Sequence, residues 1–120
     1  MHLIISCSLN PNSKSRIMAD YANEVYCKNV KLIDLQKLQM PLCDGKSCYD
    51  DPIVNILKRE IQKASSVLLA GPIYNYDLNA ASKNLIELTG SAWNDRLVGF
   101  ICAAGGKTSY MSPMILANSL

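Results

Sequence analysis

The feature that most constrains this chain is a regular alternation of short, almost continuously apolar runs with segments of helical character. Each run is too short for a core helix, and none alternates apolar with polar residues as a half-exposed strand would. Such runs suit strands that are covered on both faces, and their alternation with helices is typical of a parallel sheet. We therefore predict an α/β fold whose four parallel strands lie at Leu3–Ser6, Val30–Asp34, Ser66–Gly71 and Leu97–Cys102.

Capping residues and apolar spacing predict the first helix. Ser13 or Ser15 can cap it, because a serine hydroxyl accepts a hydrogen bond from an unpaired backbone N–H. Helical spacing places five apolar residues on one face of this helix, and we expect that face to be buried. These residues are Ile17, Tyr21, Ala22, Val25 and Tyr26.

The later helices have equally local markers. Asp51 followed by Pro52 is a strong helix start. Gly90 is placed to end a helix at Asn79–Thr89, because glycine readily adopts the left-handed conformation that closes helices. The apolar face of the second helix is expected to contain Ile53, Ile56, Leu57 and Ile61. The remaining segments are a long loop at Leu35–Asp50 and a last helix that opens at Ser112-Pro113.

Composition limits the classes of function. The chain has 120 residues, of which 49% are hydrophobic, and this suits a single domain spanning residues 1–120. A charged fraction of 18% and a net charge of +2 give no electrostatic case for nucleic acid binding. No segment approaches the roughly 18 consecutive apolar residues of a membrane helix, and the first residues lack the pattern of a signal peptide. We therefore expect a cytoplasmic protein that binds neither nucleic acid nor membranes.

The cysteine pattern argues for thiols. The count is odd, and no Cys-x-x-Cys pair occurs, so neither a disulfide framework nor a metal site is predicted. Cys43 and Cys48 flank a short polar segment, where they could be a redox pair or two ordinary thiols. The five cysteines are Cys7, Cys27, Cys43, Cys48 and Cys102.

The loop Ser8–Arg16 follows the first predicted strand and precedes the first helix. In open α/β sheets, ligands bind at the carboxyl ends of the strands. A phosphate group there needs hydroxyl and backbone N–H donors and the positive end of a helix. The loop lacks the glycine patterns of dinucleotide and triphosphate sites, so its hydroxyl groups suit a phosphate monoester. The alternative is an ordinary capping loop.

Two further loops follow strands. Pro72–Asp77 contains Tyr74 and Tyr76, whose rings could form a flat wall for an aromatic ligand or could pack on a neighbouring surface. Ala103–Ser109 is rich in small residues, which allow close approach of the backbone to a ligand. The alternative for this third loop is a flexible connection.

Together, these three segments resemble the NADPH-dependent FMN reductases, a family of flavodoxin-like enzymes that includes azoreductases, chromate reductases and quinone reductases. Ser8–Arg16 resembles the phosphate loop of that family. Pro72-Ile73-Tyr74-Asn75, with Lys83-Asn84 in the next helix, is similar to a segment that usually reads Pro-Glu-Tyr-Asn before a helix containing Lys-Asn. Val98–Phe100 and Gly105-Gly106 look like the fourth strand and glycine loop of the family. Ile73 is a departure, because the family usually has Glu at that position.

The resemblance implies a flavodoxin-like three-layer sandwich with a parallel sheet, FMN as the cofactor and NADPH or NADH as the electron donor. The acceptor would be a small molecule such as a quinone, an azo compound, a metal ion or a free flavin. The residues implied for the phosphate are Ser8, Asn10, Ser13, Ser15 and Arg16. The residues implied for the isoalloxazine are Pro72, Tyr74, Asn75 and Tyr76 on one edge and Ala104, Gly105 and Gly106 near the other.

The resemblance also implies a homo-oligomer, either a dimer or a tetramer, with Tyr74, Tyr76 and Trp93 near the interface or the site. No side chain is implied as a catalytic acid or base, since the flavin carries the reaction. Family members usually continue with a fifth strand and a last helix, so the fifth strand of the sheet is expected to be missing.

Three other interpretations remain at this point. A tyrosine phosphatase of low molecular weight has a similar first loop, but its chemistry requires Cys, five residues and then Arg. Cys7 is followed at that distance by Ser13. A flavodoxin that only carries electrons is the second alternative, although such carriers are usually strongly acidic. A shortened flavoprotein with little activity is the third.

Overall fold

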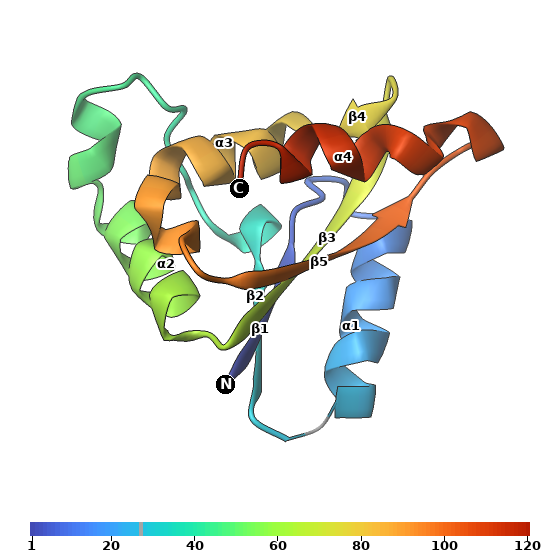
Figure 1. Cartoon of the computed structure of the whole chain (residues 1–120), viewed down its shortest axis with the longest axis horizontal. Coiled ribbons are helices and arrows are strands. Elements are labelled where there is room, and N and C mark those ends of the chain that lie inside the picture. The colour runs from blue at the N-terminus through green and yellow to red at the C-terminus, as the bar shows by residue number, and fades with distance from the viewer. Residues whose placement is uncertain (27) are drawn as a thin grey trace.

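The computed structural model describes residues 1–26 and 28–120, so Cys27 lies outside the described residues. Its centre is a parallel sheet of β1 (His2–Ser6), β2 (Val30–Asp34), β3 (Ser66–Tyr74) and β5 (Leu97–Ala103). The order across this sheet is β2-β1-β3-β5, and His2 of β1 is in register with Val30 of β2 and Ser66 of β3. The prediction of a parallel sheet with helices on both faces is confirmed (Figure 1).

The helices form the two outer layers. α1 (Lys14–Tyr26) packs on one face of the sheet, where Ala19 and Ala22 contact a cluster that includes Ile4 and Ala70. α2 (Pro52–Lys63), α3 (Ala80–Thr89) and α4 (Ser112–Ala117) lie on the other side (Figure 1). Successive residues of a strand point to opposite faces. This explains why Leu3 and Ile5 belong to a separate core cluster from Ile4.

The apolar face predicted for α1 is mostly wrong. Of its five members, only Ala22 is buried, and the buried face instead combines Ala22 with Ser15 and Ala19. Small side chains let the helix axis approach the sheet closely, so the larger residues turn to the side. The exposed fractions are 68% for Ile17, 68% for Tyr21, 58% for Val25 and 65% for Tyr26.

The local helix markers are confirmed. The carboxylate of Asp51 accepts a 2.7 Å hydrogen bond from the N–H of Ile53, and Pro52 occupies the first turn of α2. Gly90 closes α3 with a φ of +47°. The predicted face of α2 is shifted, because Val54 is buried with Leu57 and Ile61 whereas Ile56 is about half exposed.

The segment predicted as a loop after Gly71 is largely strand. β3 continues to Tyr74, turns at Asn75 and Tyr76, and returns as β4 (Asp77–Leu78), which pairs antiparallel with β3. Asn75 and Tyr76 both have positive φ, +53° and +67°, which is the backbone conformation of a type I′ hairpin turn. The described residues therefore form five strands, which are the four predicted parallel strands and the short antiparallel β4.

Short 3₁₀ helices complete the connections. They are η1 (Leu35–Lys37), η2 (Ser47–Asp50), η3 (Gly90–Trp93) and η4 (Lys107–Met111). Trp93 is only 3% exposed, and its indole N–H donates a 2.7 Å hydrogen bond to the hydroxyl of Thr89. Trp93 is therefore a core residue of this chain, and its expected place near an interface or the site stays a prediction. Within the described ranges, no helix has the length and apolar character needed to span a membrane.

Candidate functional site

The loop after β1 is shaped by its own side chains. The N–H of Cys7 donates to the carbonyl of Ala70 at 2.7 Å, which continues the pairing of β1 with β3. Beyond Cys7 the chain turns, as the hydroxyl of Ser8 accepts from the N–H of Asn10 and the amide oxygen of Asn10 accepts from Asn12. These bonds use donors and acceptors that the turn leaves unpaired, so the loop has a defined shape at the carboxyl end of the sheet.

The start of α1 presents buried hydroxyl groups. The hydroxyl of Ser13 accepts a 3.1 Å hydrogen bond from the N–H of Arg16, so Ser13 is the N-cap. The hydroxyl groups of Ser13 and Ser15 lie 2.9 Å apart, and both side chains are buried. The N–H groups of Lys14 and Ser15 belong to the first helical turn, where a helix has no carbonyl to accept them. This end of α1 therefore concentrates donors and partial positive charge.

Arg16 is directed away from these donors. Its guanidinium donates a 2.8 Å hydrogen bond to Asp20, one turn along the helix, and a further bond to Asp34 at the end of β2. The hydrogen bond to Asp20 is the main reason that the pKa of Arg16 is raised above its usual value. Arg16 thus joins α1 to β2, and its side chain does not reach the donors of the loop.

The loops after β1 and β3 are tied together by Asn79. Its side-chain N–H donates to the carbonyl of Cys7 at 2.7 Å, and its oxygen accepts a 2.7 Å hydrogen bond from the hydroxyl of Ser82. Its backbone N–H donates to the carbonyl of Pro72. Gly71 lies against this network, and a Cβ there would be 3.4 Å from the side-chain oxygen of Asn79 and 3.3 Å from that of Ser82.

From the sequence, Asn79 is predicted only to begin a helix. An asparagine at an N-cap usually accepts from its own helix, and nothing local indicates that this side chain bonds instead to Cys7, which is 72 residues earlier. The available indication is its position just after Pro72–Asp77, a loop already identified as a candidate ligand-binding segment.

The three predicted loops meet around a cavity of about 260 Å³. Within the described part of the chain, no Asp or Glu lines it, so the lining suits an anion. The lining residues are Ser8, Asn10, Asn12, Ser13, Lys14, Ser15, Pro72, Ile73, Tyr74, Ala103, Ala104 and Gly105. The structure thus brings together eight of the twelve predicted site residues.

A second hollow, of about 290 Å³, adjoins the first and shares Ile73 and Gly105 with it. Three more predicted residues line it, namely Asn75, Tyr76 and Gly106. A Cβ at Gly105 or Gly106 would meet nothing within 4 Å, so the protein itself does not require glycine there. Arg16 is the one predicted residue that lines neither hollow.

A larger cavity, of about 440 Å³, lies at the opposite, amino end of the strands and is lined by residues such as Leu3, Tyr26, Val67 and Leu97. Its walls are mainly apolar, and it lacks the convergent hydroxyl groups of the loop Ser8–Arg16, which we call the serine loop. We therefore place the candidate site at the smaller cavity, where polar donors and aromatic surface converge.

Cys7 does not behave as a nucleophile. Its side chain is completely buried at the end of β1, and burial raises the pKa of its thiol to about 12. A thiol with this pKa is protonated at neutral pH, and the thiolate is the reactive form. The phosphatase motif also requires Arg where this chain has Ser13, so the phosphatase interpretation has no support from the site.

The fold and the site together define an α/β protein with a hydroxyl-rich loop between its first strand and first helix. The sequence matches the family model of the NADPH-dependent FMN reductases over residues 2–115. This protein belongs to that family.

Individual proteins agree with this assignment. An NAD(P)H:quinone oxidoreductase from Solanum tuberosum is 31% identical over 110 residues, covering 82% of this chain and 56% of that protein. This chain therefore spans a little more than half the length of that curated relative. Among solved structures, the apo form of an NADH:FMN oxidoreductase (EMOB) superposes with a TM-score of 0.80 at 17% identity, covering 99% of this chain and 66% of that one.

An azoreductase from Bacillus anthracis has a TM-score of 0.77 at 15% identity, with 98% of this chain and 78% of that chain covered. The flavoenzyme FerB from Paracoccus denitrificans, an NAD(P)H:(acceptor) oxidoreductase, has a TM-score of 0.78 at 18% identity. The superposition covers 98% of this chain and 68% of that chain. At such identities, these similarities confirm the predicted flavodoxin-like fold class.

Proposed function

We propose that this protein binds FMN in the cavity between the three loops, with its phosphate in the serine loop. The observation that carries the proposal is the pair of buried hydroxyl groups of Ser13 and Ser15 at the N-terminus of α1, in a cavity without acidic lining. Ser8 and Asn10 add polar groups from the same loop. We leave Arg16 out of the proposed contacts, because its guanidinium already pairs with Asp20 and Asp34.

The isoalloxazine would extend from the phosphate toward the end of β3. Pro72 and Tyr74 line the first cavity, and Asn75 and Tyr76 line the second, so the two hollows together offer a continuous surface. Ala104, Gly105 and Gly106 face it from the other side. Without a Cβ, the two glycines allow the backbone to approach a flat ring.

The proposed activity is electron transfer from NADPH or NADH to a small-molecule acceptor, such as a quinone, an azo compound, a metal ion or a free flavin. Bound FMN would supply the redox chemistry, and the protein would supply binding, orientation and electrostatics. The family assignment and the names of the quinone and azo reductase relatives support this proposal. We further propose one domain spanning residues 1–120 that acts in the cytoplasm, which suits its four described free thiols.

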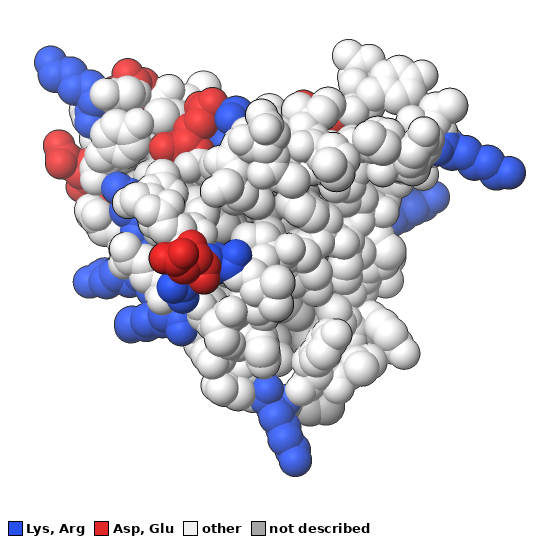
Figure 2. All heavy atoms as spheres, in the orientation of Figure 1, with Lys and Arg blue, Asp and Glu red and all other residues white. Residues whose placement is uncertain are grey.

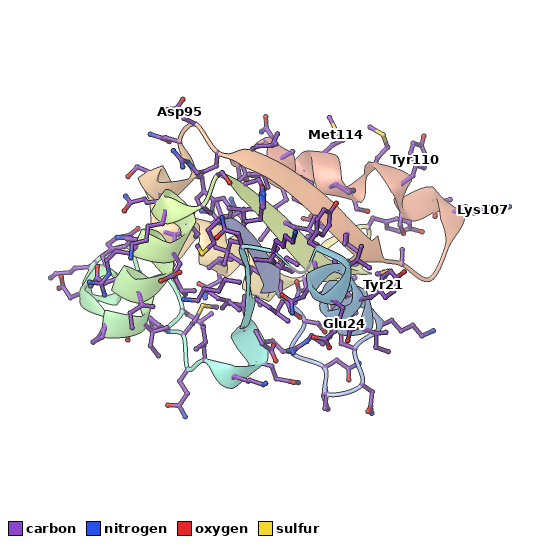
Figure 3. The ribbon with its side chains drawn as sticks, turned by 90° about the horizontal axis from the view of Figure 1, so that it is seen from below. Tyr21, Glu24, Asp95, Lys107, Tyr110 and Met114 are labelled. Carbon is purple, nitrogen blue, oxygen red and sulfur yellow. The ribbon has the colours of Figure 1, made fainter. Side chains whose placement is uncertain are left out.

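The partner that we propose for assembly is a second copy of this chain. β5 lies at one edge of the sheet and pairs, among the described strands, with β3 alone. The surface over β5 and α4 in Figure 2 carries mainly uncharged side chains. In Figure 3, Tyr110 and Met114 point outward beside β5, and they are 79% and 61% exposed. Burying such a surface between two copies would remove apolar area and an open strand edge from water.

FMN titration of the purified protein tests the proposed site. Replacing both Ser13 and Ser15 by Ala removes donors worth about 1.5–3 kcal/mol each toward a charged phosphate, so affinity should fall at least about 100-fold. Ser91→Ala, at an exposed serine outside both hollows, is the matched control. Thermal unfolding of each variant separates loss of binding from loss of the helix cap. Equal FMN affinity of a folded double variant and the wild type would remove the serine loop from the site.

The activity is tested separately by rapid mixing of the FMN-loaded protein with NADPH or NADH. The flavin absorbance should bleach faster than that of free FMN. If FMN binds but neither nucleotide reduces it faster than in solution, the protein is a carrier or an inactive relative.

A further inference from the structure

Two cysteines lie in contact in the long connection that precedes α2. The sulfur atoms of Cys43 and Cys48 are 3.8 Å apart, within hydrogen-bond distance for sulfur. Cys48 is buried and belongs to η2, whereas Cys43 is partly exposed. Neither residue lines the cavities of the proposed FMN site. Figure 1 shows the segment around η2, drawn in green, at the opposite end of the molecule from the loop after β5.

Asp44 folds the segment so that the two thiols meet. Its carboxylate accepts hydrogen bonds from the N–H of Lys46 at 2.9 Å and of Cys48 at 3.0 Å, and from the hydroxyl of Ser47. Gly45 turns the chain with a φ of +71°, a conformation that other residues adopt only with strain. The contact between the thiols is therefore built by local hydrogen bonds.

The segment is also anchored to α3 through Asn84. The side-chain oxygen of Asn84 accepts a 2.9 Å hydrogen bond from the N–H of Cys43, and its nitrogen donates to the carbonyl of Pro41 at 3.0 Å. One side chain thus pairs with the N–H of Cys43 and with the carbonyl of Pro41, two residues earlier. These two bonds tie the backbone around Cys43 to α3.

The surroundings of the two thiols differ. The hydroxyl of Tyr49 lies 3.5 Å from the sulfur of Cys43, and this hydrogen bond is the main reason that the pKa of Cys43 is lowered. The same hydrogen bond raises the pKa of Tyr49 to about 12, so Tyr49 keeps its proton at neutral pH and can donate a hydrogen bond to a thiolate at Cys43. Burial is the main reason that the pKa of Cys48 is raised. Cys43 is thus the more reactive thiol, and Cys48 lies beside it.

We propose that Cys43 and Cys48 form a peroxide-reactive dithiol that closes to an intramolecular disulfide. The sulfur of Cys43, as thiolate, attacks one oxygen of hydrogen peroxide, so that an S–O bond forms, the O–O bond breaks and hydroxide leaves to be protonated to water. The sulfur of Cys48 then attacks that of Cys43, forming the S–S bond and releasing the second oxygen as water. In total, the two thiols lose two electrons and two protons, and one peroxide becomes two waters.

The geometry suits the second step. A disulfide bond is about 2.05 Å long, so each sulfur has only a short distance to move from its position at 3.8 Å. The segment between the two cysteines contains Gly45, whose backbone can adjust at little cost. The proposal does not rest on the proposed FMN site, because it concerns residues that lie outside it and an oxidant that is added.

The test uses the purified chain of 120 residues with added hydrogen peroxide. The mass of the intact chain is measured first, and free thiols are then alkylated for peptide mapping by mass spectrometry. The wild-type chain should lose the mass of two hydrogen atoms, and a thiol reductant should restore the mass. Lys46 lies between Cys43 and Cys48, so trypsin separates them into two peptides that remain linked only through the disulfide. This mapping needs no variant and is independent of how a variant folds.

Variants then assign the steps. Cys43→Ser should abolish the loss of two hydrogens, whereas Cys48→Ser should accumulate a sulfenic acid at Cys43 that a cyclic 1,3-dione traps. Cys102→Ser is the matched control, because Cys102 is also partly exposed and should leave the linked peptides unchanged. Peroxide-treated wild-type protein in which these two peptides are not linked, or in which they are linked mainly to other cysteines or to another chain, would overturn the proposal.

Discussion

The side-chain N–H of Asn79 donates a 2.7 Å hydrogen bond to the backbone carbonyl of Cys7, and this bond joins the loop after β1 to the start of α3. Both residues are buried, so neither group has water as an alternative partner. One amide group therefore links the proposed phosphate loop to the start of α3, in addition to the pairing of β1 with β3.

We expect Asn79→Ala to destabilise the protein by about 1–3 kcal/mol, because it leaves the carbonyl of Cys7 and the hydroxyl of Ser82 without their partner. Urea unfolding measures the change in free energy. Asn94→Ala, at an exposed position, is the control and should change it by less than about 0.5 kcal/mol. If the FMN site is as proposed, the folded Asn79 variant should also bind FMN more weakly. A free energy of unfolding equal to that of the control would show that this bond is not important for stability.

We predict that Arg16 stabilises the fold but does not contribute to FMN binding. Arg16→Gln removes the pairing with Asp20 and with the largely buried carboxylate of Asp34, so we expect a loss of about 1–2 kcal/mol in stability. Because the guanidinium does not line the cavity, FMN affinity of the folded variant should change by less than about threefold. Unfolding curves and FMN titration, run beside the Ser13 and Ser15 double variant, measure the two effects. A drop in affinity as large as that of the double variant would place Arg16 on the phosphate.

The hydrogen bonds to Asp44 predict a dependence on pH. The bond from Ser47 is the main reason that the pKa of Asp44 lies well below its usual range. A carboxylate whose pKa is lowered by folding stabilises the protein above the unfolded pKa, which is about 3.9, and loses this contribution as pH falls through the folded pKa. Asp44→Asn should therefore lower the urea midpoint at pH 6, and the difference from wild type should shrink toward pH 2.

The control for this experiment is Asp95→Asn, an exposed position with a positive φ that asparagine also tolerates. Its difference from wild type should be small at pH 6. A deficit of the Asp44 variant that stays constant between pH 6 and pH 2 would contradict the assigned role of the carboxylate.

The proposed assembly predicts a particle larger than one chain of 13.2 kDa. Sedimentation at micromolar concentration should give a mass about twice that value for the wild type. Replacing Tyr110 and Met114 by Lys should shift the mass to that of the monomer, because charges would have to be buried between the copies. The control is Leu42→Lys, which changes an 82% exposed leucine in the distant connection before η2. A wild-type monomer at all concentrations would exclude the second copy as the partner of this surface.

The local features of the fold could be predicted because each depends on residues that are close in sequence. The N-cap at Asp51 involves a hydrogen bond to a residue two positions later, and the stop at Gly90 needs only a backbone conformation. A continuous apolar run predicts a strand that is covered on both faces, because its side chains point alternately to the two faces and all of them are apolar. The serine loop could be identified as a candidate site because its hydroxyl residues stand together in the sequence, between a predicted strand and a predicted helix.

Tertiary structure decided what each side chain faces. The sequence alone could not show that α1 buries Ala19 and Ala22 while exposing Ile17 and Tyr21, because helical spacing defines a stripe but not the surface that receives it. It likewise could not show that Arg16 pairs with Asp34, since that contact depends on where β2 ends beside α1. Local hydrogen bonds and the burial of apolar runs fix the secondary-structure elements and the chemistry of the loops, and both can be read from nearby residues. Long-range packing, which brings together atoms far apart in the chain, decided which of those groups meet in the site.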